Sequence, residues 1–203
     1  MPRISSIFLR CLAVSFLLAS YERVAAGEEA REAFDAFLKE RSGGKVEHVL
    51  GMVGFFGEPL PPQWLILFST DLSRDVLHES VVSKGQIRAE RTFRRLPNQD
   101  LPTIPIRRQE LKIDSGRAFE LAEEVAKKAK VSFENAHFQL RCRDAGKEPV
   151  WMIQFLGRAQ VSLGSVYLSA RSGEILRVSW VQPKAVPEKD SGLETFASGR
   201  GAK

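Results

Sequence analysis

Two stretches of the chain show the hydrophobic periodicity of amphipathic helices. In residues 28–41 and 115–130, apolar residues recur at spacings of three and four, with charged residues between them. We expect Ser42-Gly43-Gly44 to end the first helix and Asp114 to cap the second. The apolar positions are Ala30, Ala33, Phe34, Phe37 and Leu38 in the first helix, and Ala118, Leu121, Ala122, Val125 and Ala129 in the second.

Each predicted helix is followed by apolar runs of strand length. Residues 62–68 and 149–155 both read Pro-x-Trp and end in Phe, and their composition is typical of β-strands. A candidate strand precedes each run, at 46–56 and 136–143. A further pair of strands around a glycine turn follows each run.

The two halves of the chain therefore show the same order of elements at an offset of 87 or 88 residues. The predicted fold class is α+β, with two repeats of one helix packed on a four-stranded antiparallel sheet. The predicted domains are a first repeat at 27–95, a Pro-rich linker at 96–113, a second repeat at 114–182 and a disordered tail at 183–203.

The first 26 residues have the pattern of a secretory signal peptide. Arg3 and Arg10 precede a short apolar run at residues 11–19, and the small residues Val24-Ala25-Ala26 follow. The run is much shorter than the roughly 20 residues that span a bilayer. Lipid modification of Cys11 is disfavoured because Arg10 stands where a small residue is required. We predict cleavage after Ala26 and a periplasmic or secreted protein.

Removal of this leader leaves a mildly basic chain with one cysteine. Residues 27–203 contain 27 basic and 24 acidic residues, a net charge of +3, which is too small to indicate a nucleic-acid partner. Because Cys142 is then the single cysteine, no internal disulfide is expected. Alternation with Phe138 and Leu140 predicts that Cys142 is a small buried hydrophobic residue.

The end of the second half resembles a known family. Residues 164–176 read GSVYLSARSGEIL and follow a helix and a Pro-x-Trp strand. This resembles the PepSY family of small exported domains, over about residues 114–181. The first half departs from that pattern, because residues 84–87 lack the acidic residue after the glycine and no Tyr precedes them. The resemblance implies a helix over an antiparallel sheet and a role in regulating or inhibiting peptidases or in binding envelope proteins. It implies no catalytic residues.

The sequence contains none of the common nucleophile, nucleotide-binding or zinc motifs, so we predict no enzyme activity and no cofactor. His48 and His137 occupy similar places in the two halves. They could be paired ligands or a pH sensor. Because a zinc site needs three or four ligands and no cluster supplies the others, we favour two solvent-facing residues.

Three tryptophans and one basic stretch are candidate binding surfaces. Trp64 and Trp151 lie in apolar runs and are expected in the core, whereas Trp180 is a better candidate for exposure. Residues 84–112 carry a local excess of positive charge. This stretch could be a solvated linker, which we favour, or could bind an acidic protein surface or phospholipid head groups. The candidate partner-binding residues are Arg94, Arg95, Arg107 and Arg108. Exposed strand edges are a second route to partner binding.

Together these features predict an exported, non-catalytic binding module whose partner is a protein, either a peptidase or another envelope protein. Two alternatives remain open. One is a small-ligand-binding or enzymatic protein of cystatin-like α+β fold with a pocket. The other is an electrostatic binder of the envelope surface. The sequence leaves open the oligomeric state and whether the two repeats share one sheet.

Overall fold

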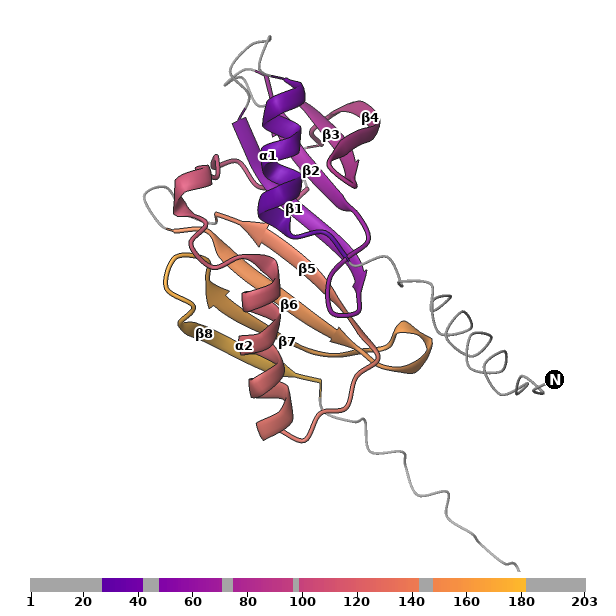
Figure 1. The fold of residues 1–203 in the computed structure, drawn as a ribbon, viewed down its shortest axis with the longest axis vertical. Helices are drawn as coiled ribbons and strands as arrows, with labels where there is room; N and C mark the ends of the chain where they lie inside the picture. Colours follow the sequence, from indigo (N-terminus) through magenta and orange to yellow (C-terminus); the bar gives the residue numbers. More distant parts are fainter. Residues whose placement is uncertain (1–26, 42–47, 71–74, 97–98, 143–147, 182–203) are drawn as a thin grey trace, which may run out of the picture.

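The structure is a computed structural model that describes residues 27–41, 48–70, 75–96, 99–142 and 148–181 (Figure 1). The predicted signal peptide and the predicted disordered tail both lie outside the described residues. The elements are α1 (Ala30–Glu40), β1 (His48–Gly57), β2 (Trp64–Ser69), β3 (Val76–Ser83), β4 (Gln86–Arg94), the 3-10 helix η1 (Arg108–Glu110), α2 (Ser115–Lys128), β5 (Asn135–Arg141), β6 (Val150–Leu156), the 3-10 helix η2 (Arg158–Gln160), β7 (Ser162–Ser169) and β8 (Ile175–Trp180).

The strands form one antiparallel sheet of eight strands in the order β4-β3-β2-β1-β5-β6-β7-β8. The predicted fold class, two repeats each with a helix on its own four-stranded sheet, is therefore wrong. The difference arises at the centre, where β1 pairs with β5 and Met52 lies opposite Leu140. Two separate sheets would each leave a row of backbone N–H and C=O groups unpaired at one edge. The pairing of β1 with β5 satisfies these groups. The division of the chain into repeats stays a prediction.

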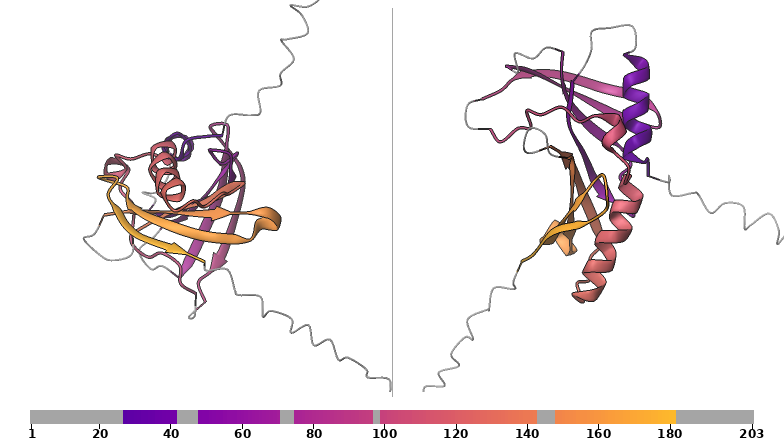
Figure 2. Two further views of the ribbon diagram at one scale, coloured as in Figure 1. Left: turned by 90° about the horizontal axis from the view of Figure 1, so that it is seen from below. Right: turned by 90° about the vertical axis from the view of Figure 1, so that its left-hand side faces the viewer.

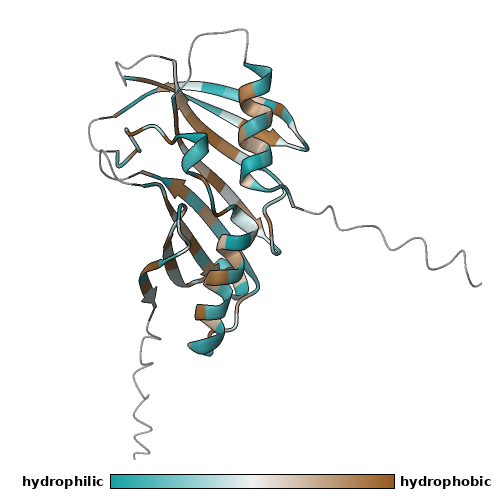
Figure 3. Ribbon diagram, turned by 60° about the vertical axis from the view of Figure 1, so that its left-hand side comes forward, coloured by the Kyte–Doolittle hydropathy of each residue, from teal (hydrophilic) through white to brown (hydrophobic). Residues whose placement is uncertain are grey.

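Both helices lie on the same side of this twisted sheet (Figure 2). Helix α1 contacts β2, β3 and β4, and α2 contacts β6 and β7. The predicted cap of the second helix is confirmed, because the Asp114 side chain accepts a hydrogen bond from the backbone N–H of Ser115. Hydrophobic residues lie along the strands and are interspersed with hydrophilic ones on the helices (Figure 3). None of the helices within the described ranges is long and apolar enough to span a membrane.

Aromatic side chains fill the space between the helices and the sheet. Trp64 and Trp151 are fully buried, as predicted, and their ring centroids lie 6.0 Å apart across the centre of the sheet. Phe138 packs edge-on against Trp64 at 5.9 Å and stacks with Phe119 of α2 at 6.0 Å. One continuous core therefore joins both helices to the sheet.

The segment that joins β4 to α2 is attached to the sheet. The N–H of Ile106 donates to the carbonyl of Val49, at 2.7 Å, and the N–H of Ile113 donates to the carbonyl of Ala170, at 2.8 Å. Ile106 and Leu111 are buried in the core. These contacts hold residues 106–113, which follow the first four strands, against both halves of the sheet.

Candidate protein-binding edge

The four arginines predicted to bind a partner have different environments. Arg94 is exposed at the end of β4. The guanidinium of Arg95 is partly buried and donates hydrogen bonds to the carbonyls of Leu101 and Pro102, both at 2.9 Å. Arg95 therefore holds the segment after β4 in place.

Arg108 likewise binds within the molecule. Its guanidinium donates to both carboxylate oxygens of Asp35 on α1, each at 2.6 Å. These hydrogen bonds raise the pKa of Arg108. Arg107, the residue before η1, is exposed. Two of the four predicted binding residues thus have intramolecular partners, and partner binding by Arg94 and Arg107 stays a prediction.

The two histidines that could have been paired ligands, His48 and His137, lie far apart in the structure. His48 begins β1, whereas His137 on β5 lies beside Phe55 and Phe56 near the other end of β1, with ring centroids 5.1 and 4.8 Å away. At about 3.4 Å per strand residue, the two histidines are roughly 25 Å apart. Within the described parts of the chain, no group of three or more His, Cys, Asp or Glu residues is placed to hold a metal ion.

Cys142 is buried, as predicted, and is part of the core. Burial raises the pKa of its thiol to about 11, with a smaller contribution from the nearby Glu110 carboxylate. The thiol is therefore protonated near neutral pH, and a protonated thiol is a poor nucleophile.

The sheet has two edges, and they differ in charge. Edge strand β4 carries Arg88, Glu90, Arg91 and Arg94 in its nine residues, whereas edge strand β8 carries Arg177 alone in its six. Charged side chains on an edge strand discourage pairing with another chain. The β8 edge is thus less protected than the β4 edge against pairing with a strand of another chain.

The hydrogen bonds between β7 and β8 show which backbone groups of β8 point outward. The N–H of Val181 donates to the carbonyl of Leu163 at 2.9 Å, and the pairs continue in register through Trp180–Gly164 and Val178–Val166. Because hydrogen-bonded and non-hydrogen-bonded pairs alternate in antiparallel strands, the N–H and C=O groups of Val178 and Trp180 face away from β7. No strand within the described ranges pairs with that side of β8.

Apolar side chains accompany these backbone groups. Leu176 is 47% exposed and Val178 is 39% exposed. Trp180, which the sequence favoured as exposed, is partly buried instead, because its ring packs on Phe155 with centroids 6.1 Å apart. β8 is therefore anchored at Trp180, and the apolar side chains of Leu176 and Val178, which precede Trp180, stay exposed.

Gly164 on β7 makes this anchoring possible. A Cβ atom at Gly164 would lie 2.3 Å from the Trp180 ring and 2.5 Å from the carbonyl oxygen of Ser179. Gly164 also has a φ of +155°, a conformation that L side chains rarely adopt. A glycine at this position lets β8 lie close against β7.

A second apolar patch lies at the end of β1. The register of β1 shifts between Gly54 and Gly57, and Phe56 has a φ of +55°. This bulge leaves Phe55 and Phe56 exposed beside His137. Burial lowers the pKa of His137, and its Nε2 atom has no hydrogen-bond partner among the described residues.

Comparison with known proteins supports the fold alone. No protein-family model and no curated protein matches the chain. The crystal structure of a protein from Clostridium difficile 630, described as a "putative lipoprotein", is similar with a TM-score of 0.50 and 10% sequence identity. The similarity covers 78% of this chain and 95% of that one. It supports an α+β fold with an antiparallel sheet, whereas no family match supports the PepSY resemblance.

Proposed function

We propose that this protein is an exported, non-catalytic binding module that captures an extended segment of a partner protein along the outer edge of β8. In this mode the partner adds a strand to the sheet, and main-chain hydrogen bonds supply much of the affinity. The observation that carries the proposal is the outward direction of the N–H and C=O groups of Val178 and Trp180 on an apolar edge.

The contrast between the two edges supports β8 as the binding strand. An added strand at β4 would meet Arg88, Glu90 and Arg91, whereas one at β8 would meet Leu176 and Val178. The partner segment should therefore be extended and apolar, so that it buries these two side chains on binding.

Core packing favours a binding module over a pocket protein. The space between the helices and the sheet, where a cystatin-like fold would enclose a ligand, holds Trp64, Trp151 and Phe138. The electrostatic alternative has less support than the sequence suggested, because Arg95 and Arg108 already bind groups of this chain.

The partner class follows from the predicted leader and from the PepSY resemblance. A chain that is exported after cleavage at Ala26 meets proteins of the envelope or the surroundings of the cell. We therefore propose an envelope protein, with a peptidase as the first kind to examine.

Site-specific cross-linking tests this proposal. A photoreactive amino acid at Val178 in residues 27–203 should cross-link to an envelope protein, which mass spectrometry then identifies, while the same group at Ala89 on β4 should not. With that purified partner, Val178→Lys should weaken binding at least tenfold because it places a charge on the apolar edge. Ala89→Lys, which adds the same charge at the other edge, should leave binding unchanged.

Hydrogen exchange distinguishes strand addition from other contacts. Partner binding should slow amide exchange at Val178 and Trp180 and leave exchange in β4 unchanged. Unchanged exchange in β8, or equal effects of the two lysine variants, would disprove the proposal.

A further inference from the structure

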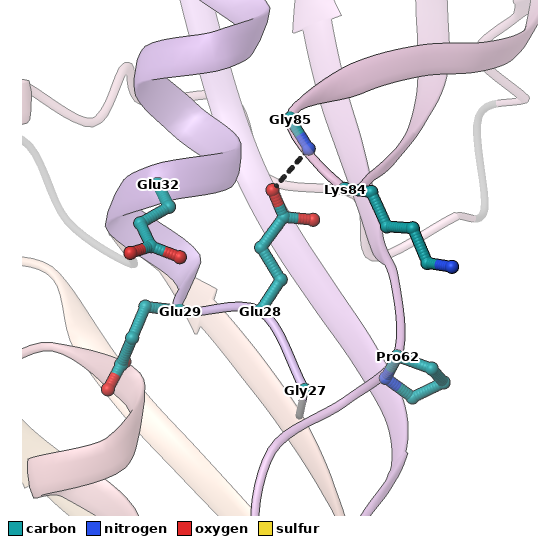
Figure 4. Close-up of a pocket in the computed structure, with 7 residues that line it drawn as sticks. All are labelled: Gly27, Glu28, Glu29, Glu32, Pro62, Lys84 and Gly85. Carbon is teal, nitrogen blue, oxygen red and sulfur yellow. Dashed lines mark hydrogen bonds between the residues drawn. The ribbon is translucent and has the colours of Figure 1, made fainter. Parts of the chain in front are cut away.

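A pocket of about 590 Å³ opens at the start of α1, away from β8. The segment Gly27–Glu28 forms one wall and the turn at Lys84–Gly85 forms another, with Pro62 beside them (Figure 4). Glu29 and Glu32 complete the lining. Its size falls within the range of small-molecule sites.

Glu28 is held rigidly in this pocket by three hydrogen bonds. Its backbone N–H donates to the carbonyl of Pro61 at 3.0 Å, and its own carbonyl accepts from Nε1 of Trp64 at 2.7 Å. Its side chain accepts from the backbone N–H of Gly85 at 2.8 Å, through Oε1. The carboxylate is therefore fixed at both its backbone and its side chain.

The second carboxylate oxygen of Glu28 has no hydrogen-bond partner among the described residues, although Glu28 is only 9% exposed. Figure 4 shows the carboxylate directed toward the Lys84–Gly85 turn, while the Lys84 side chain extends away from it. A buried carboxylate oxygen without a donor is energetically costly. A donor from a ligand would remove this cost.

The other groups in the lining make the pocket negative. Glu32 is exposed on α1, and the Glu29 side chain turns away to bind Ser115 and Gly116. Carboxylates thus outnumber Lys84, the one basic residue in the lining. A cation is the favoured occupant of such a pocket.

The arrangement fits an organic cation better than a metal ion. A hard divalent metal takes six or more oxygen ligands. Here the Glu29 carboxylate already accepts a hydrogen bond from the N–H of Gly116 on α2, and Oε1 of Glu28 already accepts one from the N–H of Gly85. An ammonium or guanidinium group needs only a well-placed acceptor, because it donates hydrogen bonds itself.

We propose that this pocket binds an alkylammonium or guanidinium group, with Oε2 of Glu28 as the principal acceptor. The cation could belong to a small amine or to a Lys or Arg side chain of a protein. This site is separate from the β8 edge, so it goes beyond the proposed function.

Isothermal titration calorimetry with residues 27–203 tests the proposal. The probes are pentane-1,5-diamine, arginine amide, and the peptide Gly-Gly-Arg-Gly-Gly, with citrulline amide as the probe whose side chain is uncharged. The charged probes should bind saturably, and citrulline amide should bind at least tenfold more weakly than arginine amide. A peptide that binds more tightly than arginine amide indicates a protein side chain as the natural ligand, and the reverse order indicates a small molecule.

Three variants locate the site. Glu28→Gln should weaken binding of the charged probes at least tenfold, because it removes the charge and retains an oxygen for the Gly85 N–H. Glu124→Gln, at an exposed position of α2, should leave binding unchanged. Lys84 is exposed, and Lys84→Glu replaces the pocket's own cation with a carboxylate. This variant should tighten binding severalfold. The result does not depend on the stability of the Glu28 variant.

The proposal is overturned if the charged probes fail to bind at millimolar concentration. It is equally overturned if citrulline amide binds as well as arginine amide, if Glu28→Gln and Glu124→Gln have equal effects, or if Lys84→Glu leaves the affinity unchanged. Thermal unfolding of each variant should accompany the titrations, so that a loss of binding is scored only in folded protein.

Discussion

Glu29 and Ser115, which are 86 residues apart in the sequence, join the starts of the two helices. Oε2 of Glu29, the residue before α1, accepts a hydrogen bond from Oγ of Ser115 at 2.6 Å and another from the backbone N–H of Gly116. Oγ of Ser115 in turn accepts from the N–H of Ala30 at 2.9 Å. Each helix therefore has its first N–H groups satisfied by a residue from the other. The Glu29 carboxylate also offsets the positive ends of both helix dipoles.

Removal of the Ser115 hydroxyl should destabilise the protein. Ser115 is fully buried, so Ser115→Ala leaves the Ala30 N–H without its acceptor. We expect the free energy of unfolding to fall by about 1–2 kcal/mol, measured by urea denaturation. Ser165→Ala, on a partly exposed position of β7, should cost less than about 0.5 kcal/mol. Equal losses in the two variants would contradict the capping role.

Stability should depend on pH through His137. Burial lowers the pKa of His137 from its usual 6.5, so the folded protein disfavours the protonated imidazole. The stabilisation from the neutral form is present above pH 6.5 and is lost as the pH falls through the folded-state pKa. Wild-type protein should therefore lose more stability between pH 7.5 and pH 5 than His137→Gln does, as urea denaturation at both pH values would show. A loss in His137→Gln identical to that of the wild type would contradict this prediction.

The close contact between β7 and β8 should depend on Gly164. In Gly164→Ala, the new methyl group overlaps both the Trp180 ring and the backbone of Ser179, so we expect a loss of about 3 kcal/mol. Gly85→Ala is a suitable comparison, since Gly85 also has a positive φ but has open space at the Cβ position. That variant should cost about 1 kcal/mol. Thermal or urea unfolding gives both values, and equal costs would show that the overlap is relieved elsewhere.

The arginines of the central basic stretch should differ in how much each contributes to the free energy of unfolding. Arg95→Ala removes two hydrogen bonds from a partly buried guanidinium to backbone carbonyls and should cost about 2 kcal/mol. Arg94→Ala, at an exposed position, should change stability by less than about 0.5 kcal/mol. Urea denaturation of the single variants tests this, and a loss in Arg95→Ala no larger than that in Arg94→Ala would contradict the anchoring role of Arg95.

The candidate sites required contacts that the sequence does not reveal. Arg108 reads as an exposed basic residue, yet its partner Asp35 is 73 residues away. Glu28 reads as the start of a charged helix, although Gly85, its partner across the pocket, is 57 residues away. Alternation along a strand predicted the burial of Cys142 because that signal is local. The same alternation predicts a strand at 175–180 without predicting that it is an edge.

The sequence by itself determined the local elements: two amphipathic helices, the Asp114 cap, the strands that contain Trp64 and Trp151, and the burial of Cys142. These follow from periodicity and from side chains that act on their own backbone. Only the tertiary structure decided that β1 pairs with β5, and hence that one sheet replaces two. Strand pairing over about 85 residues depends on which backbone groups and which core side chains meet in space, and no local pattern encodes that choice.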